Sequence, residues 1–397
     1  MQIDLLDHRN FIGGHPHEQY DWLRANAPVY WHPEPEGTGF WVITRHQDVY
    51  DIGRDAATYS NEPTISIDDP SPEQAGLLGP YKMMLTMDPP EHTNYRKLIS
   101  REFTQGPARA YNQRIEELAS QIVDAVIDKG SCDFVTDIAG EMPSFVIADL
   151  MGLPIDDGRE LYKLTEILHS SKDVVSDAAK AEAAMKMFAY GQEVIANKRA
   201  KPGDDLASKL LLAELDGRKL VDAEFLLFFL LLVDAGGDTT RNLVATGMRT
   251  LLEHPDQLAL LQANPEDLIA YAREELLRWT SPVIYMRRTV KQNVTLRGEL
   301  LREGDKVVLY YGAANRDADV FPDPHTFDIT RSPNKHIAFG GGHHICLGQW
   351  FARLEIDAIM LEVLKRMANF RIAGELEWMP SNFISGLTHM PLAYDAI

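Results

Sequence analysis

The chain has 397 residues, of which 45% are hydrophobic and 25% charged, a composition that excludes small disulfide-stapled scaffolds and wholesale disorder. Its 39 Lys and Arg against 59 Asp and Glu leave a formal net charge of −20, which argues against nucleic acid and anionic membranes as partners. Two cysteines cannot form a disulfide framework, and neither a signal-peptide core nor a membrane-length apolar run is present. We therefore expect a cytosolic protein without a membrane anchor, and length alone favours two or three domains.

The predicted elements change in character along the chain. Short strands are expected first, at 28–31 and 40–44. Helical spacing of apolar residues then predicts a run of helices, at 91–103, 108–129, 158–171, 178–198, 221–254 and 268–279. Strand-like runs return at 284–290, 294–296 and 306–311, before a helix at 350–367 and a tail of short strands. The fold class is mainly α with small β-sheets.

The helix predicted at 221–254 stands out by its length and composition. Its first half is apolar on every side, which is typical of a helix buried all round. At about 1.5 Å per residue, it is long enough to cross the whole molecule.

The most informative stretch is Phe339-Gly340-Gly341-Gly342-His343-His344-Ile345-Cys346-Leu347-Gly348. Its glycines let the main chain approach a bound group closely, and a helix is predicted directly after it. A thiol at that helix start meets unpaired N–H groups and the positive end of the helix dipole, which predicts a lowered pKa and a thiolate. A thiolate held in this way suits an axial ligand to haem iron.

Two simpler interpretations of this stretch are possible. In the first, the glycines form an ordinary turn and Cys346 is a small buried apolar residue, which is also what we expect of Cys132. A phosphate cradle is excluded because no Lys-Ser or Lys-Thr pair follows the glycines.

The pattern Phe-Gly-x-Gly-x-His-x-Cys-x-Gly, followed by Ala352-Arg353, resembles the haem-binding signature of the cytochrome P-450 superfamily of haem-thiolate monooxygenases. The resemblance implies a single-domain cytochrome P-450 fold over residues 1–397. It also implies a haem b (iron protoporphyrin IX) between the long central helix and the helix after the Cys loop, with Cys346 as the metal ligand. The haem contacts that it implies in these two segments are Phe339, Gly340, His344, Gly348, Ala235 and Gly236.

The long helix carries Ala235-Gly236-Gly237-Asp238-Thr239-Thr240 at mid-length. The pair Asp238-Thr239 resembles the acid–alcohol pair with which the family activates oxygen. In that interpretation the Thr hydroxyl positions oxygen and water while the acid relays protons, which suits a reaction that consumes two protons. The alternative is a helix with a surface acid and capping hydroxyls.

Further segments agree with the resemblance. His92 and Arg96, one helical turn apart, resemble with Arg288 and His344 the family's donors to the two haem propionates, which need cationic or N–H partners when buried. The sequence Glu275-Leu276-Leu277-Arg278 resembles the family's Glu-x-x-Arg, which pairs with a downstream arginine here matched by Arg331. The role implied for that triad is folding and haem retention.

The substrate is less well defined by the sequence. The stretch 281–289 looks like the bacterial branch that acts on terpenoids, fatty acids and sterol side chains. The expected apolar pocket consists of Ile65, Ile67, Leu77, Leu78, Met83, Met84, Leu231, Val283, Ile284, Phe383 and Ile384. Asp234 departs from the family, where an apolar residue is usual, and two interpretations stay open. It is either turned aside into an ion pair or faces the pocket, where it would favour a substrate with a hydroxyl or amine.

The electron supply is expected to come from outside, since no flavin or iron–sulfur segment is recognised. The resemblance implies O2, a soluble ferredoxin and its NAD(P)H-dependent reductase as partners of a monomeric enzyme. Candidate docking residues are Lys97, Arg101, Arg109 and Lys335, which are alternatively plain solvated charges. The competing functions are a peroxide-driven peroxygenase of the same fold and a haem sensor or carrier without activity. The intact Asp238-Thr239 pair argues against both.

Overall fold

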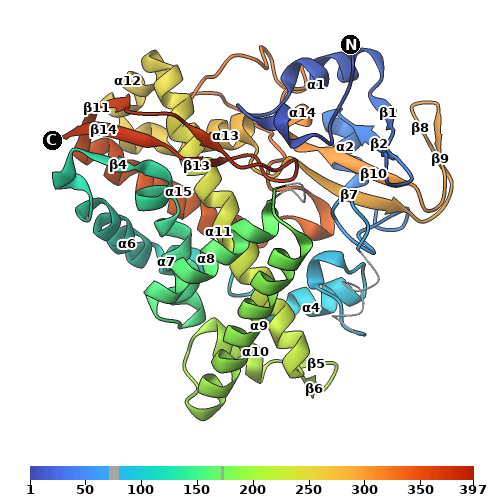
Figure 1. Cartoon of the computed structure of the whole chain (residues 1–397), viewed down its shortest axis with the longest axis horizontal. Coiled ribbons are helices and arrows are strands. Elements are labelled where there is room, and N and C mark those ends of the chain that lie inside the picture. Colours follow the sequence, from blue (N-terminus) through green and yellow to red (C-terminus); the bar gives the residue numbers. More distant parts are fainter. Residues whose placement is uncertain (71–79, 171–173) are drawn as a thin grey trace.

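The computed structural model describes residues 1–70, 80–170 and 174–397, and it is mostly helical (Figure 1). The helices are α1 (His17–Asn26), α2 (His46–Ile52), α4 (Glu91–Ser100), α5 (Gln105–Ala110), α6 (Asn112–Asp124), α7 (Glu141–Met151), α8 (Ile155–His169), α9 (Asp177–Ala200), α10 (Leu206–Leu212), α11 (Asp222–Glu253), α12 (Pro255–Ala263), α13 (Pro265–Thr280), α14 (Tyr311–Ala314) and α15 (Gln349–Arg366). The mainly helical class with small sheets is confirmed.

The strands are short and lie at the periphery. They are β1 (Val29–His32), β2 (Phe40–Ile43), β3 (Tyr59–Ser60), β4 (Ser131–Asp133), β5 (Glu214–Leu215), β6 (Arg218–Lys219), β7 (Tyr285–Val290), β8 (Val294–Leu296), β9 (Glu299–Leu301), β10 (Lys306–Tyr310), β11 (Met367–Ile372), β12 (Glu377–Trp378), β13 (Leu387–His389) and β14 (Pro391–Ala396).

The two larger sheets lie at opposite sides of the molecule (Figure 1). One has the order β1-β2-β10-β7-β3, in which β2 and β10 pair in parallel and the other neighbours are antiparallel. The other has the order β11-β14-β4 and brings the C-terminal strand against the segment of Cys132. Cys132 packs against the hydrophobic core, as expected.

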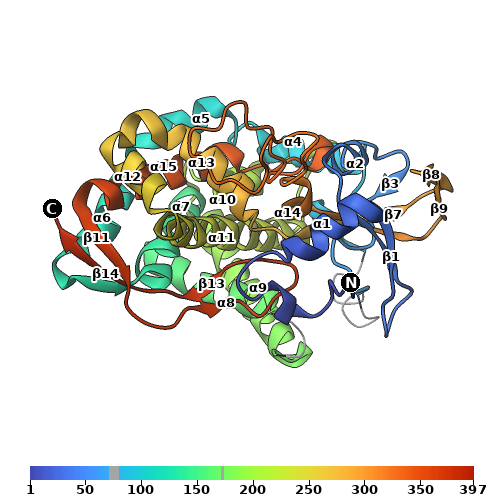
Figure 2. The same ribbon diagram turned by 90° about the horizontal axis from the view of Figure 1, so that it is seen from above.

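The long helix α11 passes through the middle of the helical part, and Figure 2 shows α7, α8 and α15 around it. Its apolar first half is buried: Phe225, Phe228 and Phe229 are each at most 2% exposed. A helix so placed has no face for water, which explains why the apolar residues of this segment show no helical stripe.

The helix ends follow local chemistry. The backbone N–H of Val221, next to the start of α11, donates to the Glu224 carboxylate at 2.9 Å, which satisfies a group that the helix itself leaves free. At the end of α13, Ser281 adopts a left-handed conformation with φ of 41° before Pro282, which cannot continue a helix. The helix expected at 108–129 is divided, because Tyr111 separates α5 from α6.

Six of the described helices, α1, α2, α7, α10, α12 and α14, are not among the predicted elements. In the parts of the chain that are described, no single helix is long and apolar enough to cross a membrane. The bent pair formed by residues Val135–Met151 and Ile155–His169 passes that test by length and composition only.

Candidate active site

The Cys loop connects the end of the β-rich region to α15. Gly340 and Gly342 have φ of 69° and 68°, in the left-handed region that favours glycine. A Cβ atom at Gly342 would lie 2.3 Å from the backbone oxygen of Gly53. Only glycine, which has no side chain, therefore allows the close packing of this loop against the segment after α2. The backbone N–H of Cys346 donates to the oxygen of Phe339 at 2.9 Å and closes the loop.

The thiol of Cys346 is held just before the first turn of α15, as the sequence predicts. The expected lowering of its pKa is wrong for the protein chain alone. Burial raises the pKa of Cys346, although the backbone N–H groups of Gly348 and Gln349 and the guanidinium of Arg96 act in the opposite direction. Burial therefore opposes the thiolate, which a metal ion beside the sulfur would favour.

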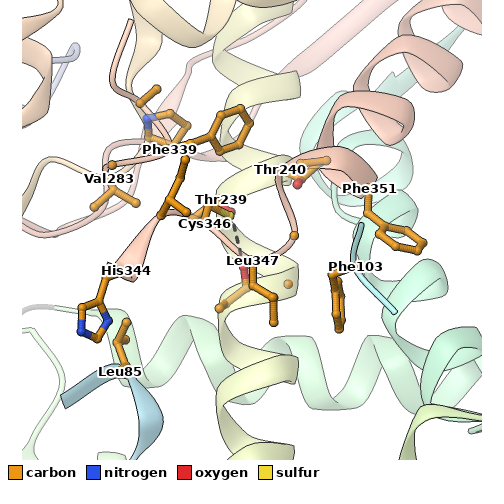
Figure 3. A pocket seen from close by; sticks show the side chains of 18 of the residues that line it. Leu85, Phe103, Thr239, Thr240, Val283, Phe339, His344, Cys346, Leu347 and Phe351 are labelled. Atoms are coloured by element: carbon orange, nitrogen blue, oxygen red, sulfur yellow. Dashed lines mark hydrogen bonds between the residues drawn. The ribbon is translucent and has the colours of Figure 1, made fainter. Parts of the chain in front are cut away.

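A cavity of about 270 Å³ lies between α11 and the Cys loop, and Cys346 is part of its wall (Figure 3). Thr239 of α11 lies in the same wall. In Figure 3, Phe103 and Phe351 lie on one side of the cavity, and Leu85 and His344 lie on the other. Phe339, Gly340, Gly348, Ala235 and Gly236 also contribute to the wall, so every haem contact predicted in these two segments surrounds one space. Most of the remaining wall is aliphatic.

The four side chains that the sequence assigns to the propionates all line this cavity: His92, Arg96, Arg288 and His344. Arg288 is 4% exposed, and among the described residues neither Arg96 nor Arg288 has an ion-pair partner; their guanidinium groups donate to the oxygens of Ile345 at 2.6 Å and Arg287 at 2.9 Å. Both ring nitrogens of His92 are buried, and neither has a hydrogen-bond partner in the described parts of the chain. Buried cations and orphaned ring nitrogens are costly unless an anion completes them.

The imidazole rings of His92 and His344 lie 3.9 Å apart between centroids. Burial and the neighbouring cations lower the pKa of His92 to about 4 and that of His344 to about 2, so both rings are neutral donors or acceptors at pH 7. A flat group with carboxylates at one edge and a metal ion at its centre fits this donor set: the carboxylates would meet these four side chains and the metal ion would meet Cys346. The residues present therefore fit a haem.

The structure separates the acid from the alcohol of the predicted pair. The hydroxyl of Thr239 faces the cavity side and lies 3.4 Å from the Ala235 oxygen. Asp238 is fully buried, is not part of the cavity wall, and is directed toward α8. There its carboxylate forms an ion pair with the imidazole of His169, and the Thr165 hydroxyl lies 3.3 Å from its other oxygen.

His169 is the functional candidate that the sequence did not reveal. It is the last residue of α8, about 70 positions before Asp238, and helical spacing says nothing about contacts at that separation. The one available signal was Asp234, whose unusual charge called for a partner: it lies 3.2 Å from the His169 ring. Of the two interpretations of Asp234, the geometry agrees with the ion pair, because Asp234 is absent from the cavity wall.

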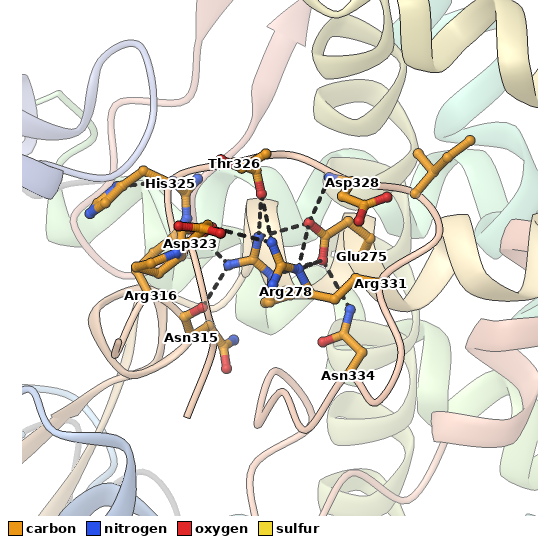
Figure 4. Close-up of polar contacts among 12 residues, drawn as sticks. Glu275, Arg278, Asn315, Arg316, Asp323, His325, Thr326, Asp328, Arg331 and Asn334 are labelled. Atoms are coloured by element: carbon orange, nitrogen blue, oxygen red, sulfur yellow. Dashed lines mark hydrogen bonds and ion pairs between the residues drawn. The ribbon is translucent and has the colours of Figure 1, made fainter. Parts of the chain in front are cut away.

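Glu275, Arg278 and Arg331 meet in one cluster, in which Glu275 and Arg278 are buried (Figure 4). Arg278 donates to Glu275 with two bonds of 2.7 Å, and Arg331 lies 3.2 Å from the same carboxylate. Glu275 and Arg278 are fully buried, so the pair is far from the everyday surface ion pair that i,i+3 spacing suggests.

The cluster also joins segments that are distant in the sequence. Asn334 and the backbone N–H of Asp328 each donate to Glu275 at 3.0 Å, while Arg278 donates to the oxygens of Asn315, Pro324 and Thr326. The amide oxygen of Asn315 in turn accepts from the N–H of Ile337, two residues before Phe339. The cluster thus holds the chain that leads into the Cys loop.

The expected substrate residues divide into two groups. Leu231, Val283 and Met84 lie in the cavity wall. Ile284, Phe383 and Ile384 do not; Ile284 and Ile384 are buried, and the Phe383 ring packs against Tyr285 with centroids 5.2 Å apart. Ile65, Ile67 and Met83 are likewise absent from the wall, and Leu77 and Leu78 lie outside the described residues.

Some side chains of the cavity wall come from a helix that the sequence did not predict. They include Pro143, Val146, Ile147 and Leu150 of α7. Hydrophobic periodicity predicts that such residues are buried and leaves open whether they face a cavity or a packed core.

This chain is similar to known proteins in sequence and in structure. The family model described as Cytochrome P450 matches residues 5–373. A steroid C26-monooxygenase of Mycolicibacterium smegmatis is 37% identical, with 99% of this chain and 96% of the relative covered. A methyl-branched lipid omega-hydroxylase of Mycobacterium bovis is 35% identical, with 94% and 89% covered. Among solved structures, a cytochrome P450 of Mycobacterium marinum in complex with pseudoionone is 35% identical, with a TM-score of 0.92 and 99% and 98% of the two chains covered.

Proposed function

Because this chain belongs to the cytochrome P450 family, an enzyme family whose members bind haem through a cysteine thiolate, we propose that it inserts one oxygen atom of O2 into a C–H bond of a small hydrophobic molecule. The observation that carries the proposal is that Thr239 and Cys346 line one cavity whose remaining wall is largely apolar. The proposal treats residues 1–397 as one catalytic domain and the protein as a cytosolic monomer.

Each group of side chains has a distinct task in this proposal. Cys346 would hold the iron of a haem b, and His92, Arg96, Arg288 and His344 would hold its propionates. The bound haem supplies the site at which O2 is activated, with the thiolate donating electron density. The chain's own contribution is a hydroxyl on Thr239 that positions oxygen and water, a carboxyl on Asp238 that delivers protons, and apolar walls that exclude bulk water and orient the substrate.

The proposed substrates are terpenoid, steroid or fatty-acid-like molecules. The support is the aliphatic wall formed by residues such as Leu231, Ile147 and Val283, together with relatives named for steroids and methyl-branched lipids. Asn61 is one of the few polar wall residues outside the haem-anchoring set and the two threonines, so a substrate buried there gains mostly from apolar contact.

The direct test is a titration of the ferric holoenzyme with pseudoionone, testosterone, hexadec-9-enoic acid and a methyl-branched fatty acid, followed by absorbance. We expect at least one to displace the haem absorption maximum, and product analysis with NADH, O2 and a surrogate ferredoxin pair to show hydroxylation. Product formed with hydrogen peroxide but not with NADH would favour the peroxygenase. No product with any oxidant would favour the sensor or carrier.

The proposed electron donor is a soluble, acidic ferredoxin with an NAD(P)H-dependent reductase. Lys97, Arg101, Arg109 and Lys335 are exposed, and no ion pair is found for them among the described residues. Lys97 lies on α4, Arg101 directly after it, Arg109 on α5 and Lys335 just before the Cys loop. Such unpaired cations on a protein of charge −20 would steer an acidic donor toward this face.

The variant Lys97→Glu/Arg101→Glu tests the docking face. We expect its reduction by ferredoxin to slow at least tenfold at low salt, since two attractive charges become repulsive, and the difference to shrink as salt rises. Lys129→Glu/Arg302→Glu is the matched control, because it changes the net charge equally at remote sites. Equal rates in the two double variants would discard this docking face.

A further inference from the structure

The imidazole of His169 lies between two carboxylates of α11. Its Nδ1 is hydrogen-bonded to Oδ2 of Asp238, and its Nε2 lies 3.2 Å from Oδ1 of Asp234. Asp234 and Asp238 are one helical turn apart on the same face. The three side chains form a row whose inner end, Asp238, is fully buried, and whose outer end, Asp234, has a quarter of its side chain exposed.

The position of His169 between two carboxylates favours a positively charged imidazole. Two carboxylates one turn apart repel each other, and a cation between them removes that repulsion. Burial opposes a charge on His169, but Asp234 and Asp238 together outweigh it and raise the pKa of the imidazole well above its usual value. The two carboxylates therefore favour the ring that holds a proton on each nitrogen.

Among the described residues, Glu166 and Arg241 beside the row pair with each other. Glu166, one turn earlier on α8, accepts from Arg241 of α11 at 2.6 Å, and Phe383 covers one side of the His169 ring with centroids 6.1 Å apart. Arg241 and Glu166 already tie α8 to α11 through a guanidinium, which keeps its proton throughout the physiological pH range. A second tie between the same helices needs no titratable ring, yet a titratable ring is what contacts Asp238.

We propose that His169 is a positioning residue that also supplies the proton to Asp238, and that Asp234 is the counter-ion that keeps His169 charged for this task. This inference rests on the proposed function, since it gives Asp238 a source for the protons that oxygen activation consumes.

The transfer is balanced within the row. The Nδ1–H bond of the imidazolium breaks, its electron pair stays on Nδ1, and the proton forms an O–H bond at Oδ2 of Asp238. The ring becomes neutral and keeps its Nε2–H toward Asp234. Asp238 is then a neutral acid that no longer attracts the ring and is free to turn toward the Thr239 side. Once Asp238 has turned away, a hydronium ion of the solvent gives its proton to Nδ1 and becomes water; the His169 side chain is 14% exposed to that solvent.

The first test reads the ring directly and needs no turnover. Long-range ¹H–¹⁵N spectra of the ferrous, carbon-monoxide-bound holoenzyme report whether each histidine ring carries one proton or two, and the spectrum of His169→Gln assigns the signal. We expect a doubly protonated ring at pH 7 in the wild type. Asp234→Asn should lower the pKa of His169 by about one unit or more, because it removes one of the two opposing charges. A ring that is neutral at pH 7 in the wild type would overturn the inference.

The second test separates proton supply from a mere ion pair. His169→Arg keeps a cation between the two carboxylates but cannot release a proton at neutral pH, whereas His169→Gln removes both properties. With NADH, a plant-type ferredoxin, its reductase and testosterone, we expect both variants to release at least fivefold more hydrogen peroxide per NADH than the wild type and to show a changed solvent deuterium isotope effect.

Arg159→Gln is the matched control, because it breaks the exposed ion pair between Arg159 of α8 and Glu141 of α7 and leaves the row and the Glu166–Arg241 pair in place. We expect its isotope effect and peroxide yield to resemble those of the wild type. Wild-type values in His169→Arg would overturn the proton-supply role and reduce His169 to an ionic tie. If no variant, including the wild type, is reduced by ferredoxin, the proposed electron supply fails, while the ring spectra still decide the state of His169.

Discussion

The buried cluster around Glu275 offers a sharp test of how this protein holds its Cys loop. The perturbation is Glu275→Gln, which keeps the shape of the side chain and removes its charge. Glu275 accepts hydrogen bonds from Arg278, Arg331, Asn334 and the backbone of Asp328, and both it and Arg278 are fully buried. The variant leaves two guanidinium groups without their counter-ion.

The magnitude follows from the burial. Removing one partner of a buried ion pair costs about 3–5 kcal/mol, because the remaining charge stays desolvated. Arg331→Gln is the comparison: its side chain is 11% exposed, Glu275 keeps Arg278, and the expected cost is about 1–2 kcal/mol. With a total stability of about 5–15 kcal/mol, only the first change threatens the fold.

The assay is urea unfolding of the holoprotein, followed by tryptophan fluorescence and by haem absorbance. In Glu275→Gln we expect the haem signal to be lost at lower urea than the fluorescence signal, since Asn315 links Arg278 to the backbone of Ile337 at the start of the Cys loop. A cost below about 1 kcal/mol, or a cost no larger than that of Arg331→Gln, would refute the reasoning from burial.

Three further predictions concern the loop and the cavity. Gly342→Ala should abolish stable haem incorporation, because its Cβ would lie 2.3 Å from the Gly53 oxygen at a φ of 68°. Gly341→Ala should retain it, because the backbone there is extended and no described atom lies within 4 Å of the new Cβ. Equal haem content in the two purified variants would contradict this. Arg288→Gln should speed haem transfer to apomyoglobin at least tenfold relative to Arg302→Gln, a control at an exposed residue. The reason is that Arg288 is a buried cation without a carboxylate partner among the described residues. Similar transfer rates would show that Arg288 does not anchor the haem. Burial raises the pKa of Glu355 to about 8 from 4.5, so the unfolded state loses this proton at a lower pH than the folded state. The unfolding free energy of the wild type relative to Glu355→Gln should therefore fall by at most about 5 kcal/mol between pH 4.5 and 8. A difference that does not change with pH in urea unfolding would show that Glu355 is not buried as a neutral acid.

Local pattern was sufficient where the determinants are adjacent in sequence. Helical spacing located α11 to within one residue at each end, and the strands β7, β8 and β10 were also correctly placed. It failed at α7, whose residues are apolar on nearly every side and so show no stripe.

The pairings across the chain were only partly accessible. Arg331 was matched to Glu275 by family resemblance, and nothing in spacing alone connects positions 56 residues apart. For Ile284 and Ile384, hydrophobicity predicted burial correctly and could not say whether a buried side chain faces a cavity or the core.

Adjacent residues were enough to predict the Cys loop, because its glycines, its cysteine and the start of the following helix are consecutive in the chain. The charge state of the groups around the loop depends instead on how the chain packs in space. Burial raises the pKa of Cys346 against its local helix start, and His169 arrives from another helix to pair with Asp238. Desolvation and long-range ion pairs depend on what surrounds a side chain in space, which no local pattern contains.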